Sequence, residues 1–132
     1  MLLVKTRLGL SDLHRLGLFA DQYIPKGTVI WQFKEGYDVR LDKTNVNSLP
    51  EFAKKQILHY GYLNNDRFVL CSDDARYFNH SDSPNTGEVE SDDGEGLTVA
   101  VVDIEKGEEL TCDYGEFDAD YSRKQTEENP FR

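Results

Sequence analysis

The sequence predicts a mostly β domain, and three observations support this fold class. Short runs of apolar, β-branched and aromatic residues are separated by glycine and proline turns along most of the chain. Only one stretch, between residues 48 and 61, has helical spacing over several turns. With 132 residues, of which 38% are hydrophobic, the chain is long enough for one domain with a single core. We therefore expect many short strands and one substantial helix.

The N-terminal quarter is expected to contain two strands. Apolar and polar residues alternate from residue 2 to residue 8, which is typical of a half-buried strand, and residues 11–15 follow as a loop. A Pro-Lys-Gly turn at residues 25–27 precedes a β-branched and aromatic run over residues 28–33, which predicts the second strand. Trp31 in this run is expected to pack in the core.

The helix is expected to begin at a capping box. Ser48 and Glu51 have the capping-box spacing, and Pro50 lies in the first turn. Apolar and long side chains follow at near-helical spacing as far as Tyr60, and Gly61 ends the pattern. A helix of about three turns is therefore predicted.

Two hairpins are predicted after the helix. The first covers residues 62–70 and turns at residues 64–66, and the second pairs residues 88–90 with 97–102. Between the hairpins, Asp73 or Asp74 is expected to cap a short helical turn. After the second hairpin, residues 104–109 are expected to form another turn into a strand. The acidic residues of the second hairpin lack calcium-loop spacing, so a solvated tip is expected there.

The chain is strongly acidic, with 15 Lys and Arg against 25 Asp and Glu, a net charge of -10. This charge repels phosphate backbones, so we expect no direct nucleic-acid binding, and it favours a basic protein or peptide partner. An acidity that serves only solubility is the alternative. Candidate groups for attracting such a partner are Glu88, Glu90, Asp92, Asp93, Asp118 and Asp120.

Compartment signals predict a cytoplasmic protein. The apolar start of the chain is interrupted at once by Lys5 and Arg7, so no signal-peptide core is present, and no apolar run is long enough to cross a membrane. The two cysteines, Cys71 and Cys112, form no CxxC pair, which indicates reduced thiols rather than a zinc cluster or a disulfide framework.

The densest polar stretch lies at residues 76–85, with amide, imidazole and hydroxyl groups after two aromatic residues. Polar groups this dense indicate a pocket wall, because buried polar side chains need partners; a turn that satisfies its own groups is the alternative. Residues 108–115 form the second unusual stretch.

Four segments together resemble the SET-domain protein lysine methyltransferases. These segments are Arg15-Leu16-Gly17-Leu18-Phe19-Ala20, Ala75-Arg76-Tyr77-Phe78-Asn79-His80-Ser81 with Pro84-Asn85, Gly107-Glu108-Glu109-Leu110-Thr111, and Asp113-Tyr114-Gly115. The order and pairing of these motifs are specific, although each alone is weak. The resemblance covers residues 2–117, which predicts a SET domain over residues 1–117 and a tail over residues 118–132 that could act as a lid.

The resemblance implies a β-clip fold of several small curved sheets with a C-terminal pseudoknot. It also implies S-adenosyl-L-methionine as the cofactor and a lysine of a basic protein tail, histone or histone-like, as the substrate. Cofactor and lysine enter from opposite faces of the family's fold and meet in a narrow channel. Asp82 stands where nuclear members often have a zinc-binding Cys, so the chain is most similar to the short bacterial and viral members, and no metal site is expected.

Six residues are implied as the cofactor site. The backbone of Arg15 and Leu16, with Gly17, would approach the methionine part of the cofactor, where a side chain on Gly17 would clash. Arg76 would bind the carboxylate or brace the motif. Asn79 and His80 would contact the amino and adenine groups, and a purely structural role is the alternative for His80.

Tyr114 is the implied catalytic residue, acting by positioning and electrostatics, with a buried structural tyrosine as the alternative. Cys112 stands where the family usually has Phe or Tyr and lines the substrate channel, which favours di- or trimethylation because its side chain is small. Three aromatic residues are candidates for closing the channel: Phe117, Tyr121 and Phe131. The alternative is that a second subunit of a homodimer closes it.

Two further hypotheses stay open. Arg15 replaces the usual Gly of the family, which together with Cys112 motivates a catalytically inactive SET-like module that binds a peptide or partner. A metal hydrolase is the third hypothesis. It would combine His80 with Asp73, Asp74, Asp82 or Asp113, but these residues match no usual ligand spacing.

Overall fold

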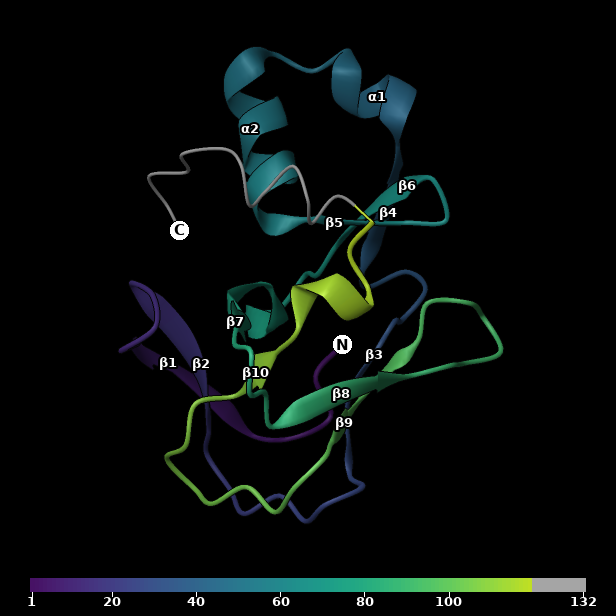
Figure 1. The fold of residues 1–132 in the computed structure, drawn as a ribbon. Helices are drawn as coiled ribbons and strands as arrows, with labels where there is room; N and C mark the ends of the chain where they lie inside the picture. The colour runs from purple at the N-terminus through teal and green to yellow at the C-terminus, as the bar shows by residue number, and fades with distance from the viewer. Residues whose placement is uncertain (120–132) are drawn as a thin grey trace.

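A computed structural model of the protein describes residues 1–119, and its strands outnumber its helices (Figure 1). In these residues, ten short strands form two two-stranded and two three-stranded sheets. The predicted mostly β fold with one substantial helix is confirmed. Tyr121 and Phe131, which were predicted to close the substrate channel, lie outside the described residues, as does Asp120.

The first sheet is an antiparallel pair formed by β1 (Thr6–Leu10) and β2 (Leu16–Ala20). The first strand was predicted over residues 2–8 but lies further along, because Leu2 forms only an isolated bridge with Trp31. The loop over residues 11–15 is present as predicted. On β2, Leu18 and Ala20 are fully buried and anchor the pair to the core.

The second sheet has the order β3-β9-β8, with β3 at Val29–Gln32, β9 at Leu97–Ala100 and β8 at Thr86–Val89. Both pairings are antiparallel. Thr98 on β9 lies opposite Trp31 on one side and Glu88 on the other. Partners that face each other across strands point to the same face, so these three side chains form a row across the sheet.

The third sheet has the order β4-β6-β5, with β4 at Val39–Asp42, β6 at Arg67–Leu70 and β5 at Tyr62–Asn64. The β5–β6 hairpin is the first one predicted. Its turn residues Asn65 and Asp66 have φ of 49° and 63°, which suits Asn and Asp better than other side chains.

Two helices, α1 (Lys43–Asn47) and α2 (Glu51–Tyr60), lie above the third sheet (Figure 1). Helix α2 is the predicted helix, and Gly61 is its C-cap. The predicted capping box is wrong, because α2 has no side-chain cap and follows Pro50 directly. Ser48 instead ends α1, the helix that was not predicted, and its hydroxyl donates to the Asn45 carbonyl at 2.7 Å.

The buried carboxylate of Asp38 fixes the start of the chain beside β3. The Met1 amine donates to its Oδ2 at 2.8 Å, and the Lys34 N–H donates to the same oxygen at 2.9 Å. Its other oxygen accepts from the Ser72 N–H at 3.2 Å. These contacts join three segments that are distant in sequence.

The two polar stretches singled out in the sequence meet in a fourth, parallel sheet. It pairs β7 (Asn79–His80) with β10 (Thr111–Cys112) near the centre of the molecule (Figure 1). The 3-10 helix η1 (Asp74–Tyr77) leads into β7, and Asp73 caps it by accepting from the Ala75 N–H at 3.1 Å, as predicted.

After β10, the chain forms the 3-10 helix η2 (Tyr114–Glu116) and returns to β5. There the Ala119 N–H donates to the Leu63 carbonyl at 2.9 Å. Among the described residues, no helix is long and apolar enough to span a bilayer.

Candidate active site

Tyr114 stands where the two polar stretches join. Its hydroxyl donates a hydrogen bond to the Phe78 carbonyl, and its backbone N–H donates to Nδ1 of His80 at 3.1 Å. The ring is therefore held from both ends by the segment before and within β7. This arrangement leaves the phenol fixed in one orientation between two cavities.

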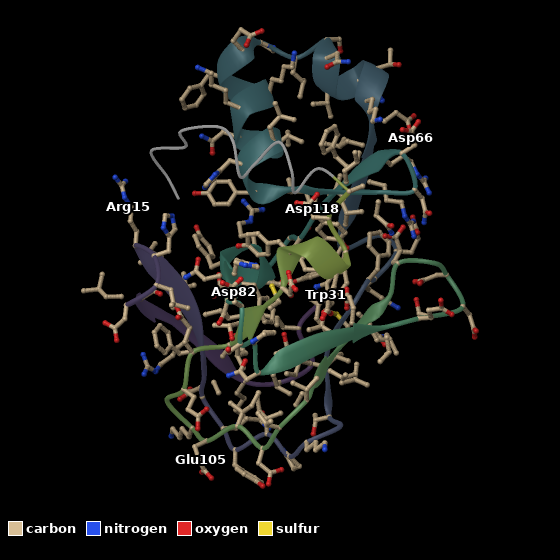
Figure 2. All side chains as sticks on the ribbon, viewed as in Figure 1. Arg15, Trp31, Asp66, Asp82, Glu105 and Asp118 are labelled. Atoms are coloured by element: carbon tan, nitrogen blue, oxygen red, sulfur yellow. The ribbon has the colours of Figure 1, made fainter. Side chains whose placement is uncertain are left out.

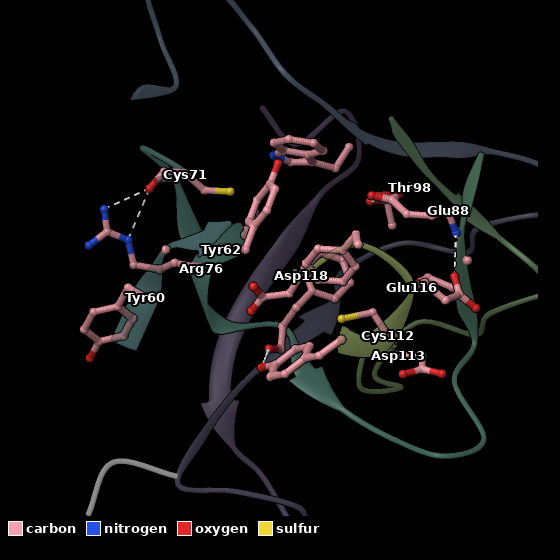
Figure 3. Close-up of a pocket in the computed structure, with 18 residues that line it drawn as sticks. Tyr60, Tyr62, Cys71, Arg76, Glu88, Thr98, Cys112, Asp113, Glu116 and Asp118 are labelled. Carbon is pink, nitrogen blue, oxygen red and sulfur yellow. Dashed lines mark hydrogen bonds between the residues drawn. The ribbon is translucent and has the colours of Figure 1, made fainter. Parts of the chain in front are cut away.

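The two cavities share the side chains of Tyr60, Arg76, Phe78 and Tyr114. We call the first the arginine cavity, because Arg15 and Arg76 line it together with Leu16 and Asn79. We call the second the cysteine cavity, because Cys71 and Cys112 both line it (Figure 3). Five of the residues predicted for the site, including Tyr114, therefore lie on the arginine cavity.

The arginine cavity is cationic within an acidic protein. Its wall holds two arginines and two histidines, His14 and His59, and within the described part of the chain no Asp or Glu lines it. Arg15 is exposed and projects at the outer end of the β1–β2 sheet (Figure 2). A guanidinium here can bind a carboxylate with two hydrogen bonds, so the cavity suits an anionic group of a ligand.

Arg76 braces the wall between the cavities. Its Nε and Nη2 donate to the Cys71 carbonyl at 3.3 and 2.8 Å, and its guanidinium lies 5.5 Å from the centre of the Tyr60 ring. Both halves of the predicted role, bracing and carboxylate binding, are compatible with this position.

Asn79 is buried and ties three segments together. Its side-chain amide donates to the Leu16 carbonyl at 2.9 Å, and its nitrogen lies 3.2 Å from both Ser11 Oγ and Glu109 Oε1. The amide therefore fixes the loop before β2 against β7, which shapes the arginine cavity.

A side chain at position 17 would collide with the carboxylate of Glu109 unless that carboxylate moved. A Cβ at this position would lie 1.8 Å from Oε1 of Glu109, the same oxygen that accepts from Asn79. The family resemblance implied close approach of the cofactor to Gly17, whereas here the Glu109 carboxylate fills the space beside it.

His80 holds the loop after β7. Because Nδ1 accepts from the Tyr114 N–H, Nε2 carries the proton and donates to Asp82 Oδ1 at 3.0 Å. His80 is not among the residues that line either cavity. A contact between His80 and the cofactor stays a prediction.

The cysteine cavity contains both described residues that were predicted for the substrate channel. Cys112 is buried, and Phe117 packs edge-on against Tyr62 and Tyr114 with ring centres 5.2 and 6.0 Å apart. Cys71 and Cys112 form no disulfide. Burial raises the pKa of the Cys71 thiol far above its usual range, so this thiol stays protonated.

Two residues of the cysteine cavity were not predicted as site residues. The Tyr62 hydroxyl and the Trp31 indole N–H are buried, and neither has a hydrogen-bond partner among residues 1–119. Burial also raises the pKa of Tyr62 far above its ordinary value, so its phenol stays neutral. The sequence analysis placed Tyr62 in a strand and Trp31 in the core. Aromatic residues with a polar group are common in strands, so this feature alone does not identify a residue of a binding site.

Carboxylates line the other side of the cysteine cavity (Figure 3). The Glu116 Oε2 accepts from the Glu88 N–H at 3.1 Å, and Thr98 donates to the Glu88 side chain at 3.2 Å. Burial raises the pKa of Glu88 to about 7; the Thr98 hydrogen bond opposes this shift, and the charge of Glu116 adds to it.

The turn of the second hairpin, which was predicted to be fully solvated, is solvated only in part. Glu95 was expected in that tip but is 5% exposed, and its carboxylate accepts from Arg40 Nε at 2.8 Å. In the part of the chain that is described, no group of three His, Cys, Asp or Glu residues could hold a metal ion. His80 lies near Asp82, and its Nδ1 is 3.7 Å from Asp113 Oδ1.

Comparison with known proteins adds a family assignment to this geometry. A family model described as the SET domain matches residues 15–115. A search of curated proteins returned no match.

Solved structures share the fold. One belongs to a Plasmodium falciparum protein whose name assigns it to the histone methyltransferases: 23% identity, TM-score 0.62, covering 85% of this chain and 94% of that one. Another is a humanized mutant of Chaetomium thermophilum Polycomb Repressive Complex 2 with a bound inhibitor: 21% identity, TM-score 0.67, covering 91% of this chain. An apo form of the Chaetomium complex matches at 21% identity, with a TM-score of 0.66 over 92% of this chain. The match spans 16% of the Polycomb chain in each case.

Proposed function

The chain belongs to the SET-domain family, and we propose that it is an S-adenosyl-L-methionine-dependent protein lysine N-methyltransferase. One observation carries this proposal: two cavities of different character meet at the fixed phenol of Tyr114. One cavity is cationic, and the other has an aromatic and thiol wall with carboxylates at one side. Such a pair suits a reaction in which two ligands enter from different faces and react between them.

The residues of the arginine cavity fit the cofactor. Arg15 and Arg76 are available on the wall for its carboxylate, while Tyr60 and Tyr77 offer ring surfaces for its adenine. Asn79 fixes the backbone of Leu16 as part of the wall. When bound, S-adenosyl-L-methionine would supply an electrophilic methyl group on a sulfonium centre.

Tyr114 would align the reacting atoms. Its hydroxyl proton points to the Phe78 carbonyl, and a phenol oxygen in this orientation can accept from polarised C–H groups or an amine. A dipole fixed before the reaction needs no reorganisation during it, so Tyr114 contributes orientation and electrostatic stabilisation without covalent attack.

The cysteine cavity would favour the neutral form of a substrate lysine. With an ordinary pKa near 10.4, deprotonating a lysine at pH 7 costs about 4 to 5 kcal/mol. Trp31, Tyr62 and Phe117 exclude water from the wall, and burial of this kind lowers the pKa of an amine.

We propose a basic protein tail as the substrate, with histones or histone-like proteins as candidates. The net charge of -10 supports a basic partner, as do the carboxylates at the edge of the cysteine cavity. The name of the Plasmodium protein points to the same substrate class.

A methyl-transfer assay tests the proposal. The protein is incubated with radiolabelled S-adenosyl-L-methionine, a histone mixture and a cell lysate, with Tyr114→Phe as the matched control. We expect label on a lysine side chain with the unaltered protein and a strong loss with the variant. Calorimetry with the cofactor adds a second readout, because the alternative of an inactive partner-binding module, motivated by Arg15, predicts no cofactor binding.

A further inference from the structure

An acidic groove continues from the cysteine cavity along the second hairpin. The groove and the cavity share the side chains of Tyr62, Glu88, Glu116 and Phe117. Glu90 and Glu95 also line the groove, so four of its wall residues are glutamates. A ligand that extends from the cysteine cavity into the groove therefore passes these carboxylates.

The four carboxylates are not equivalent. Glu95 is neutralised, because it accepts from Arg40 Nε at 2.8 Å and from the Asn64 amide at 3.2 Å. Glu88 and Glu116 form no ion pair with a cation in the described residues. They are nonetheless held together, since the Glu88 N–H donates to Glu116 at 3.1 Å (Figure 3).

A second observation points to a ligand at the same place. Trp31, Thr98 and Glu88 form one row across the second sheet, and all three line the cysteine cavity. Trp31 is only 4% exposed, and its indole N–H has no hydrogen-bond partner among residues 1–119. The neighbouring Tyr62 hydroxyl is also buried and also has no partner among these residues. Buried polar groups are normally paired, so these two groups indicate that a polar ligand completes the wall. The Tyr62 oxygen can accept from a guanidinium or ammonium, whereas the Trp31 N–H only donates and would bind a main-chain carbonyl of the same ligand.

We propose that Glu88 and Glu116 bind a second cationic side chain of the substrate, an arginine or lysine that flanks the target lysine. This inference rests on the proposed function, because it takes the cysteine cavity as the place of the target lysine. The chain would then recognise a pair of basic residues rather than a single lysine.

A bound cation would compensate the negative charges of Glu88 and Glu116, and this is the physical reason for the proposal. Two neighbouring carboxylates repel each other, and burial of Glu88 disfavours its charged form further. A guanidinium or ammonium between them compensates both effects and forms charge-assisted hydrogen bonds. Within the described chain, no cluster of His, Cys, Asp and Glu could hold a metal ion, so a side-chain cation is the fitting class of ligand.

A peptide series tests the proposal. The probe is a fluorescent synthetic peptide with one central lysine among uncharged residues, compared with peptides that carry one added arginine at each flanking position in turn. We expect one position to strengthen binding by about tenfold or more, as one charge-assisted hydrogen bond can do, and the gain to shrink with added salt.

Glu88→Gln and Glu116→Gln should each remove most of this gain. Glu105→Gln is the matched control, because it removes the same charge from a turn far from Trp31 (Figure 2) and should keep the gain. Circular dichroism checks that each variant is folded. The proposal is overturned if no arginine position strengthens binding, or if both groove variants keep the full gain.

Two readouts separate this inference from the proposed function. Binding is also measured with the central lysine replaced by norleucine, and methyl transfer is measured separately on the lysine peptides. An arginine gain that is lost in the variants, without any methyl transfer, supports the groove and contradicts the proposed function. Equal methyl transfer to all peptides, without any arginine gain, supports the proposed function and contradicts the groove.

Discussion

The Tyr114 hydroxyl donates a hydrogen bond to the main-chain carbonyl of Phe78. The two residues are 36 positions apart, and their contact closes the site between the segment before β7 and the segment after β10. A hydrogen bond to the main chain restrains the orientation of the phenol, because the backbone at Phe78 moves less readily than a side chain would.

The first prediction concerns this contact. Tyr114→Phe keeps the ring but removes the hydroxyl, so methyl transfer should fall by about a hundredfold or more, as for loss of one preorganised polar group. Stability should fall by only about 1 kcal/mol, the usual effect of one lost hydrogen bond. Initial rates and chemical unfolding measure the two effects. Unchanged rates with a stability loss would leave Tyr114 with a structural role alone.

The second prediction concerns Gly17. Adding a methyl group there displaces the Glu109 carboxylate and so breaks its contact with Asn79, which should destabilise the fold by about 1 to 2 kcal/mol. In a Glu109→Ala background the same change should be milder, because the obstructing carboxylate is gone. Urea unfolding of the two single variants and the double variant measures this coupling. Purely additive effects would show that Glu109 is not the obstacle.

The third prediction is a pH dependence from Glu88. Burial raises its pKa from the ordinary 4.5 to about 7, so the folded protein binds this proton more tightly than the unfolded chain. The stability it contributes is fully present below pH 4.5 and is lost as the pH rises through about 7. Glu88→Gln cannot ionise and should be more stable than the parent protein at about pH 8, by at most about 3 kcal/mol.

Thermal unfolding at several pH values measures this difference. Glu90→Gln, an exposed neighbour, is the control and should follow the parent protein at each pH. If Glu88→Gln were more stable than the parent protein by the same amount at low and at high pH, the result would contradict the raised pKa of Glu88.

The fourth prediction concerns Asp38, whose side chain is fully buried and accepts from the Met1 amine, Lys34 and Ser72. Asp38→Ala leaves these donors without their acceptor and should destabilise the fold by about 3 kcal/mol or more. Asp66→Asn breaks the exposed pair with Lys43 and should have little effect. Denaturant unfolding of both variants measures their loss of stability. Equal losses of stability would show that the burial of Asp38 does not make its contacts stronger than the exposed ion pair.

The fifth prediction concerns the number of methyl groups added. Cys112 leaves more room on the wall of the cysteine cavity than a Phe or Tyr would, so we expect di- or trimethyl product. Cys112→Tyr should shift the product towards monomethyl lysine. Mass spectrometry of a methylated substrate at long reaction times measures this, and monomethyl product alone from the parent protein would refute the hypothesis.

Much of the fold could be predicted from local patterns. The hairpin at Asn65 and the end of α2 at Gly61 follow from turn and terminator residues, whose backbone preferences act within a few positions. The motif residues around Asn79 could be assigned to one site only through the family resemblance, because the β7–β10 pairing is not local.

Other features depend on tertiary contacts that no short pattern contains. Ser48 had a suitable spacing to cap α2, but the chain uses it to end α1. Glu95 was grouped with solvated acids, but Arg40 on a different sheet pairs with it and buries it. The polar tips of Trp31 and Tyr62, which have no hydrogen-bond partner among residues 1–119, meet in a cavity between three sheets that no local pattern predicts.

The parallel pairing of β7 with β10 also bears on how the protein acquires its activity. Thr111 and Cys112 must reach Asn79 and His80 across a long intervening chain, and closing such loops slows folding relative to forming local turns. Both cavities depend on that closure, since Tyr114 follows β10 directly. We expect the hairpins to form early and the ability to bind ligands to appear only with the last cooperative step of folding. A chain that ends before residue 114 would therefore contain most of the strand segments but neither cavity.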